Sequence, residues 1–120
     1  MKVMVVEGNP EAANGMTMLV EALGHEVRTA FDGEEALVVA GAFHPKVVLL
    51  DLNMPRMDGY EACRRMRLQP WGMKVTIVAM AGSGQAAVRS KTALAGFDLH
   101  FVKPVTPDLI AGTLEERATA

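Results

Sequence analysis

The chain has 120 residues, of which 50% are hydrophobic and 22% are charged, and this balance predicts one globular domain with a buried core. The formal net charge of −2 gives no electrostatic reason to expect direct binding of nucleic acid. No apolar run approaches the roughly 20 residues that cross a bilayer, so membrane insertion is not expected. The single cysteine, Cys63, cannot form an internal disulfide, which agrees with a reducing, cytoplasmic location.

Short runs rich in apolar and β-branched residues predict the strands. In chain order they are residues 2–6, 26–30, 47–51, 74–80 and 98–102. The runs 47–51 and 74–80 are almost continuously apolar, which is typical of central strands in a parallel sheet that is covered on both faces.

Helical periodicity fills the segments between these strands. The first helix is predicted to begin at Asn9 and Pro10, because Asn caps the free N–H groups at a helix end and Pro fits the opening position. Gly24 suits the left-handed residue that ends this helix. The apolar face of the helix is predicted to comprise Ala12, Met16, Leu19, Val20 and Leu23.

The remaining helices also have recognisable ends. The second and third open with an acid–x–x–Glu capping box, at Asp32 and Asp58, in which the acid binds one free N–H and the glutamate returns to another. The fourth helix is predicted from about Gln85 to Ala95, and the fifth begins at Thr106. Inward-facing residues of the fifth helix are predicted to be Leu109, Ile110 and Leu114.

This strand–helix alternation predicts an α/β fold with a parallel sheet and right-handed crossovers. In open sheets of this kind the chemistry sits at the carboxyl ends of the strands. Glu7, Asp51, the segment after Met80, and Lys103 all fall at that edge. Two carboxylates and one ammonium gathered there suit a divalent cation such as Mg²⁺ together with a phosphoryl group. The alternatives are that Asp51 merely caps a loop and that Lys103 is solvated.

Three stretches then carry a family resemblance: LVEALGHEVRTAFDGEEAL, VVLLDLNMPRMDGYEACRRMR and LAGFDLHFVKPV. They resemble the receiver domain of bacterial two-component response regulators, above all the receivers attached to hybrid sensor kinases. The D-x-x-M-P-x-M-D-G-x-E pattern from Asp51 to Glu61, with Lys103–Pro104 downstream, is a specific signal of that family. The resemblance covers residues 1–120 as one receiver domain. It implies a flavodoxin-like (βα)5 three-layer sandwich with a five-stranded parallel sheet of order 2-1-3-4-5.

The resemblance also implies roles for individual residues. Asp51 would be the phosphoacceptor, taking a phosphoryl group from a phosphohistidine on a sensor histidine kinase or a histidine phosphotransfer protein. Glu7, Asp51 and the backbone carbonyl of Asn53 would hold Mg²⁺, while Lys103 would contact Asp51 and then the phosphoryl oxygens. The Lys103–Pro104 peptide bond is often cis in this family.

A receiver domain is a signalling module and not an enzyme, apart from self-catalysed phosphotransfer and dephosphorylation. The resemblance implies that it reports its state through the fourth helix, the fifth strand and the fifth helix. The output partner is not named by the sequence, and a homodimer is left open.

The sequence departs from the family at three positions. The family has two adjacent acids after its first strand, and here that pair is Glu7–Gly8. Gly8 therefore marks the position of a lost metal ligand. Mg²⁺ binding is expected to be weak, with water filling the space over Gly8. The switch Thr or Ser after the fourth strand is replaced by Ala81, which has no hydroxyl. Ser83 could substitute only if the loop rearranged, and a turn serine is the plainer interpretation. The usual aromatic switch residue is His100, which is expected to serve a partner surface before it serves as a ligand.

Two hypotheses follow from these departures. The first is a phosphoacceptor receiver with impaired metal binding and a weakened switch, which the intact Asp51, Lys103 and MPRMDG loop favour. The second is a degenerate pseudo-receiver that acts as a phosphorylation-independent protein-interaction module, which the loss of both the acid and the hydroxyl favours. A flavodoxin-like cofactor binder is disfavoured, because the segment EGNPEAANG lacks the G-x-G-x-x-G spacing of a phosphate-binding loop.

Overall fold

The structure is a computed structural model that describes residues 1–119. Strands and helices alternate along the whole chain, as the sequence predicts. The strands are β1 (Lys2–Val6), β2 (Glu26–Ala30), β3 (Val47–Asp51), β4 (Thr76–Ala81) and β5 (Leu99–Val102). The helices are α1 (Pro10–Ala22), α2 (Gly33–Phe43), α3 (Gly59–Arg67), α4 (Ala86–Ala95) and α5 (Pro107–Ala118), with a short 3₁₀ helix η1 (Pro70–Gly72).

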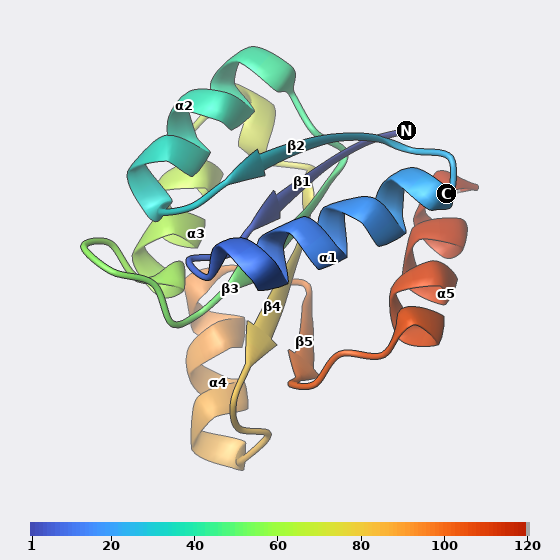
Figure 1. Cartoon of the computed structure of the whole chain (residues 1–120). Helices are drawn as coiled ribbons and strands as arrows, with labels where there is room; N and C mark the ends of the chain where they lie inside the picture. The colour runs from blue at the N-terminus through green and yellow to red at the C-terminus, as the bar shows by residue number, and fades with distance from the viewer. Residues whose placement is uncertain (120) are drawn as a thin grey trace.

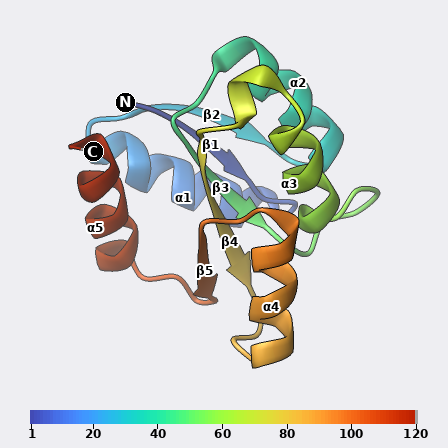
Figure 2. The same cartoon turned by 180° about the vertical axis from the view of Figure 1, so that it is seen from behind.

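All strand pairs are parallel, and the sheet has the order β2-β1-β3-β4-β5 (Figure 1). Helices α1 and α5 lie on one face of the sheet, and α2, α3 and α4 lie on the other, as the reverse view in Figure 2 shows. The predicted flavodoxin-like three-layer architecture and strand order are therefore confirmed.

The alternation of side chains along each strand divides the core into two layers. In β3, Val47 and Leu49 pack beneath α1 and α5, whereas Val48 and Leu50 pack beneath α2, α3 and α4. All residues of β3 and β4 are buried, because both strands are central and covered on both faces. Covering both faces fixes the register, since a slip of one residue would exchange the two layers.

The helix ends agree only in part with the predicted capping. Asn9 accepts hydrogen bonds from two N–H groups of α1, and Gly96, at φ 108°, ends α4. Asp32 caps α2, but Glu35 returns to the N–H of Phe31, one residue before the position that a capping box uses. Asp58 caps α3 alone, because Glu61 pairs with the arginines one turn on, Arg64 and Arg65. The predicted boxes are therefore half formed.

Other predictions were wrong in detail. Strand β4 begins and ends later than predicted, and β5 is shorter at its start. Ala12, Leu23 and Leu109 are exposed, whereas Ala13 takes the inward position on α1. The helix η1 was not predicted, because three residues carry no periodicity. In residues 1–119, none of the helices is long and apolar enough for a membrane span.

Arg67, the last residue of α3, links α3 to the C-terminal end of α4 and to the segment that leads into β4. Its guanidinium donates to the carbonyls of Gly72, Val75 and Gly96 and to the carboxylate of Asp98. Asp98 in turn accepts the N–H of Ile77, the second residue of β4. The start of β4 and the end of α4 are thereby fixed to the end of α3.

Candidate phosphoacceptor site

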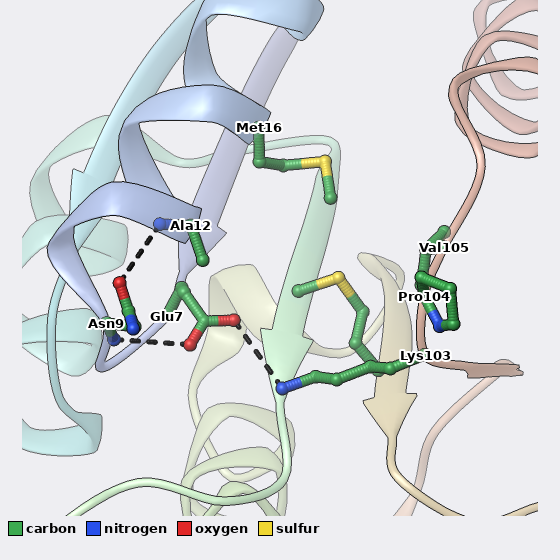
Figure 3. Close-up of a pocket in the computed structure, with 8 residues that line it drawn as sticks. Glu7, Asn9, Ala12, Met16, Lys103, Pro104 and Val105 are labelled. Carbon is green, nitrogen blue, oxygen red and sulfur yellow. Dashed lines mark hydrogen bonds and ion pairs between the residues drawn. The ribbon is translucent and has the colours of Figure 1, made fainter.

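Three charged side chains meet at the carboxyl edge of the sheet. Glu7 directly follows β1, Asp51 is the last residue of β3, and Lys103 directly follows β5. The Nζ atom of Lys103 lies 2.7 Å from Oδ1 of Asp51 and 3.7 Å from Oε2 of Glu7. Figure 3 shows the lysine side chain reaching across from the β5 side toward Glu7. The ammonium therefore lies between two carboxylates that come from separate strands.

Asp51 is almost completely enclosed, with its side chain 2% exposed, but its immediate neighbours are polar. Its Oδ1 atom accepts hydrogen bonds from the Lys103 ammonium and from the backbone N–H of Asn53, at 3.1 Å. The side chain of Lys103 is 37% exposed, and its ammonium contacts the carboxylate directly. A ligand that reaches Asp51 must displace this ammonium or bind alongside it.

Glu7 is buried at 8% exposure, and its Oε1 atom accepts the N–H of Asn9 at 3.2 Å. Burial raises the pKa of the Glu7 carboxyl above its ordinary value of 4.5, and the Asp51 carboxyl beside it raises this pKa further. The Asn9 N–H and the Lys103 ammonium act in the opposite direction. The negative charge of Glu7 is therefore costly in this position, and the Lys103 ammonium offsets only part of that cost.

A cleft of about 510 Å³ opens beside Glu7 and Lys103, between α1 and the segment that follows β5. Its polar end is formed by Glu7, Asn9 and Lys103, as Figure 3 shows. Its apolar wall is formed by Ala12, Met16, Met80, Pro104 and Val105. The Lys103–Pro104 peptide bond at this wall is cis. Of the two carboxylates, only that of Glu7 lines this cleft.

The oxygen atoms available at the site fit Mg²⁺. Two carboxylates, from Glu7 and Asp51, lie together, and Asn53 adjoins Asp51 with a backbone carbonyl that could complete the set. Mg²⁺ prefers oxygen ligands, keeps several waters, and is commonly held by one or two carboxylates. Across residues 1–119, no cluster of three or more His, Cys, Asp or Glu side chains suits a metal ion, so this site has only the smaller donor set.

Gly8 adjoins this donor set and lies against the loop that follows β3 and the carbonyl of Phe31. A Cβ atom on Gly8 would lie 3.3 Å from Cδ of Pro55, 3.7 Å from the carbonyl oxygen of Phe31 and 4.0 Å from Cγ of Met54. The loop that follows β3 therefore packs against the bare backbone of Gly8. A side chain at this position would press on Pro55, an exposed residue whose Cδ atom is bonded to the loop backbone.

The positions that correspond to the family's switch residues lie along β4 and β5. Ala81 ends β4 as a buried methyl group, and its carbonyl accepts the N–H of Lys103 at 2.7 Å. The hydroxyl of Ser83 accepts the N–H of Gln85, as a turn serine does. His100 is half-buried, and both of its ring nitrogens have partners: Nε2 lies 2.8 Å from the carbonyl of Ser83 and Nδ1 lies 3.0 Å from the hydroxyl of Thr92.

Sequence reasoning missed the involvement of Thr92. It is 2% exposed on the inner side of α4, between Val88 and Ala95, where a threonine reads simply as part of the packed face. The only available signal was its spacing from Val88 and Ala95. Nothing in the sequence alone indicated that its hydroxyl meets a histidine from β5.

The parallel sheet thus presents two carboxylates and a lysine at its carboxyl edge, a set of groups suited to a divalent cation and a phosphoryl group. The chain matches the response regulator receiver domain over residues 3–115, and it belongs to that family.

Named relatives agree with this assignment. The chain is 33% identical over 114 residues to the sensor histidine kinase RcsC of Escherichia coli K12, a match that covers 95% of this chain and 12% of the kinase. It superposes on a crystal structure of the chemotaxis protein CheY4 of Vibrio cholerae with a TM-score of 0.91 and 28% identity, covering 96% of both chains. It also superposes on the receiver domain of the sensor histidine kinase PA1611 of Pseudomonas aeruginosa with a TM-score of 0.90 and 26% identity, covering 99% of this chain and 98% of that one.

The PA1611 receiver was solved with a magnesium ion coordinated in its active-site cleft. The chain spans 43% and 12% of the length of the first two curated relatives it matches.

Proposed function

We propose that this receiver domain accepts a phosphoryl group on Asp51 from a phosphohistidine, on a sensor histidine kinase or a histidine phosphotransfer protein. The observation that carries the proposal is the contact of 2.7 Å between the Lys103 ammonium and the Asp51 carboxylate at the end of a buried central strand. Burying a carboxylate beside a lysine is costly without a use for the charge, and phosphoryl transfer uses both groups.

In the proposed reaction, an oxygen of Asp51 attacks the phosphorus of the donor phosphohistidine. The new P–O bond forms as the P–N bond breaks, and the imidazole leaves with the electron pair of that bond. Lys103 balances the charge that gathers on the phosphoryl oxygens, and it is already placed by its contact with Asp51. Mg²⁺, when bound, supplies further neutralisation of the same oxygens.

Glu7, Asp51 and Asn53 are the proposed Mg²⁺ ligands, and the binding is proposed to be weak because Gly8 supplies no carboxylate. Mg²⁺ would also relieve the cost of ionising Glu7, whose pKa is raised by burial. This proposal includes a cytoplasmic location, with which the free, buried Cys63 agrees. Its output is proposed to pass through α4, β5 and α5 to a protein partner.

The experiment is to incubate the chain with Mg²⁺ and acetyl phosphate and to measure the intact mass. One phosphoryl group should be gained by the wild type and by the control variant Asp108→Asn, which changes an exposed acid in the first turn of α5. Asp51→Asn should gain none. If Asp51→Asn gains the same mass as the wild type, Asp51 is not the acceptor.

A second function is favoured by two specific observations, the bare backbone at Gly8 and the buried methyl group at Ala81. In this alternative the domain is a pseudo-receiver that binds its partner without regulated phosphorylation. A failure of the wild type to gain a phosphoryl group from acetyl phosphate and from a cognate kinase would favour this alternative.

A further inference from the structure

A groove of about 550 Å³ lies between α2 and α3. The two helices lie side by side on one face of the sheet, as Figures 1 and 2 show. Both helices run against the strand direction, so their C-terminal ends lie at the sheet edge opposite to Asp51. The residues that line this α2–α3 groove include Leu37, Val38, Gly41, Arg65, Leu68 and Trp71.

The α2–α3 groove has apolar walls, and two of its side chains are strongly exposed. Val38 of α2 is 75% exposed, and Leu68, which follows α3, is 82% exposed. Single exposed apolar residues are ordinary on a protein surface, but these two line the same hollow as the half-buried Trp71. An apolar occupant of the groove would remove this surface from water, which is favourable.

Gly41 keeps the groove open at its α2 side. Glycine inside a helix is less stable than alanine, because it loses more conformational freedom on folding. A Cβ atom at Gly41 would lie 3.8 Å from Nε1 of Trp71, which is an ordinary contact. Within residues 1–119, neither a clash nor a left-handed backbone therefore requires glycine at this position. The missing side chain leaves open space against the indole.

Two hydrogen-bond donors of the groove are unused. Arg65 donates to Glu61 through Nε, but its two terminal nitrogens have no hydrogen-bond partner within residues 1–119. Nε1 of Trp71 also lacks a partner in that range, and it is accessible, because no buried side-chain nitrogen or oxygen there is unpaired. The His44 ring stacks on the Trp71 ring, with centroids 6.4 Å apart, and so helps to hold the indole. The groove thus offers a guanidinium and an indole N–H to an acceptor.

The charges around the groove favour an acidic occupant. Arg64 and Arg65 share one carboxylate, that of Glu61, so the formal charges of these three groups sum to +1. Glu34 and Glu35 lie in the first turn of α2, whereas the arginines lie in the last turn of α3. The two helices run in the same direction, so a carboxylate of an occupant is expected at the arginine end of the groove.

We propose that the α2–α3 groove binds an acidic amphipathic helix of a protein partner. Apolar side chains of that helix enter the groove against Trp71 and Leu68, and one of its carboxylates accepts hydrogen bonds from Arg65. A small molecule fits less well, because its site usually encloses most of its surface, whereas this groove has exposed rims. A lipid surface also fits less well, because Arg65 is the one cation among the described residues that line this hollow.

This surface is distinct from the face formed by α4, β5 and α5, and its occupancy does not depend on the proposed phosphorylation of Asp51. The test selects binders to the whole unphosphorylated chain from a phage-displayed library of helical peptides of about 16 residues. The charged positions of the library carry Asp, Glu, Lys and Arg at equal frequency. Selected peptides should be enriched in Asp and Glu. Because Trp71 is the single tryptophan, its indole N–H signal in ¹⁵N NMR should shift on titration with a selected peptide.

Two variants with matched controls locate the binding. Arg65→Ala should weaken the affinity of the selected peptide about tenfold, whereas Arg64→Ala, on the same helix and the same carboxylate, should change it less than about twofold. Gly41→Gln fills the groove and should abolish binding. Gly15→Gln makes the same change on α1, where a Cβ meets nothing within 4 Å, and should not. Glutamine favours a helix over glycine, so both glutamine variants should keep at least the wild-type urea midpoint.

The proposal is overturned if no peptide is selected, if the selected peptides are basic or uncharged, or if they leave the Trp71 signal unshifted. It is also overturned if Arg65→Ala or Gly41→Gln leaves the affinity unchanged. Sedimentation of the chain with anionic phosphatidylglycerol vesicles, if Gly41→Gln abolishes it, would assign the groove to lipid instead. A failure of Asp51 to gain a phosphoryl group would count against the proposed function alone, because the peptide selection uses the unphosphorylated chain.

Discussion

Replacing Gly8 with aspartate should tighten Mg²⁺ binding, because it returns a carboxylate to the position where the family has its second acid. The site has two carboxylates and one ammonium, so Gly8→Asp changes the sum of their formal charges from −1 to −2. A charge-assisted contact contributes about 1.5–3 kcal/mol, which corresponds to roughly a 10- to 150-fold lower Kd for Mg²⁺.

The structure also sets the cost of this substitution. The new Cβ would lie 3.3 Å from Cδ of Pro55, so the loop must move by a few tenths of an ångström. Pro55 is exposed, but its Cδ atom is bonded to the backbone nitrogen, so the backbone of the loop must move with it. Without Mg²⁺ the added charge repels Glu7 and Asp51, so the metal-free variant should be less stable than the wild type. Metal should then stabilise the variant more than it stabilises the wild type.

Isothermal titration calorimetry with MgCl₂ measures the affinity, and urea unfolding in EDTA and in Mg²⁺ measures the stability. Gly15→Asp is the matched control, because it adds the same charge to an exposed position on α1 where a Cβ meets nothing within 4 Å. An unchanged Kd in Gly8→Asp, or an equal gain in Gly15→Asp, would refute the idea that Gly8 marks a missing metal ligand.

Two more predictions concern single groups of the site. The raised pKa of Glu7 means that the folded chain keeps this proton to a higher pH than the unfolded chain, so the stability contributed by Glu7 falls as pH rises above 4.5 and stays low at neutral pH. In EDTA, Glu7→Gln should therefore raise the urea midpoint at pH 7 and lose that advantage below about pH 4, and an equal advantage at both pH values contradicts the assignment. Ala81→Thr should make the amide shifts of residues 82–85 respond to beryllofluoride, whereas Ala81→Val, which adds a similar volume without a hydroxyl, should not. Equal responses in the two variants would show that the hydroxyl is irrelevant.

Much of the fold could be predicted because its signals are local. The apolar runs of β3 and β4 and the caps at Asn9 and Asp58 are each legible within a few residues. The strand order came from the family resemblance, since pairing between distant strands leaves no local trace. Details that depend on tertiary contacts were missed, such as the return of Glu35 to Phe31 and the exposure of Leu109.

The candidate site was likewise predictable only where its signals are local. The position of Glu7, Asp51 and Lys103 at strand ends was legible, because parallel strands share one carboxyl edge. The packing of Pro55 over Gly8 was not, because it depends on how a loop of irregular backbone folds back. The two-sided bonding of His100 also escaped prediction, because its partners come from a loop and a helix that the sequence does not align with β5.

The two ends of α4 are held by different contacts, because Arg67 of α3 binds only the C-terminal end. Its C-terminal end is anchored, since the Gly96 carbonyl accepts two hydrogen bonds from Arg67, while the loop before its N-terminal end is contacted by His100 at the Ser83 carbonyl and by Arg89 at the Gly84 carbonyl. A helix of 10 residues is about 15 Å long, so a tilt of about 10° around the anchored end would carry the first turn by roughly 2.5 Å. A tilt about the Arg67 anchor would therefore displace the N-terminal end of α4 the most, and His100 contacts the loop that leads into that end.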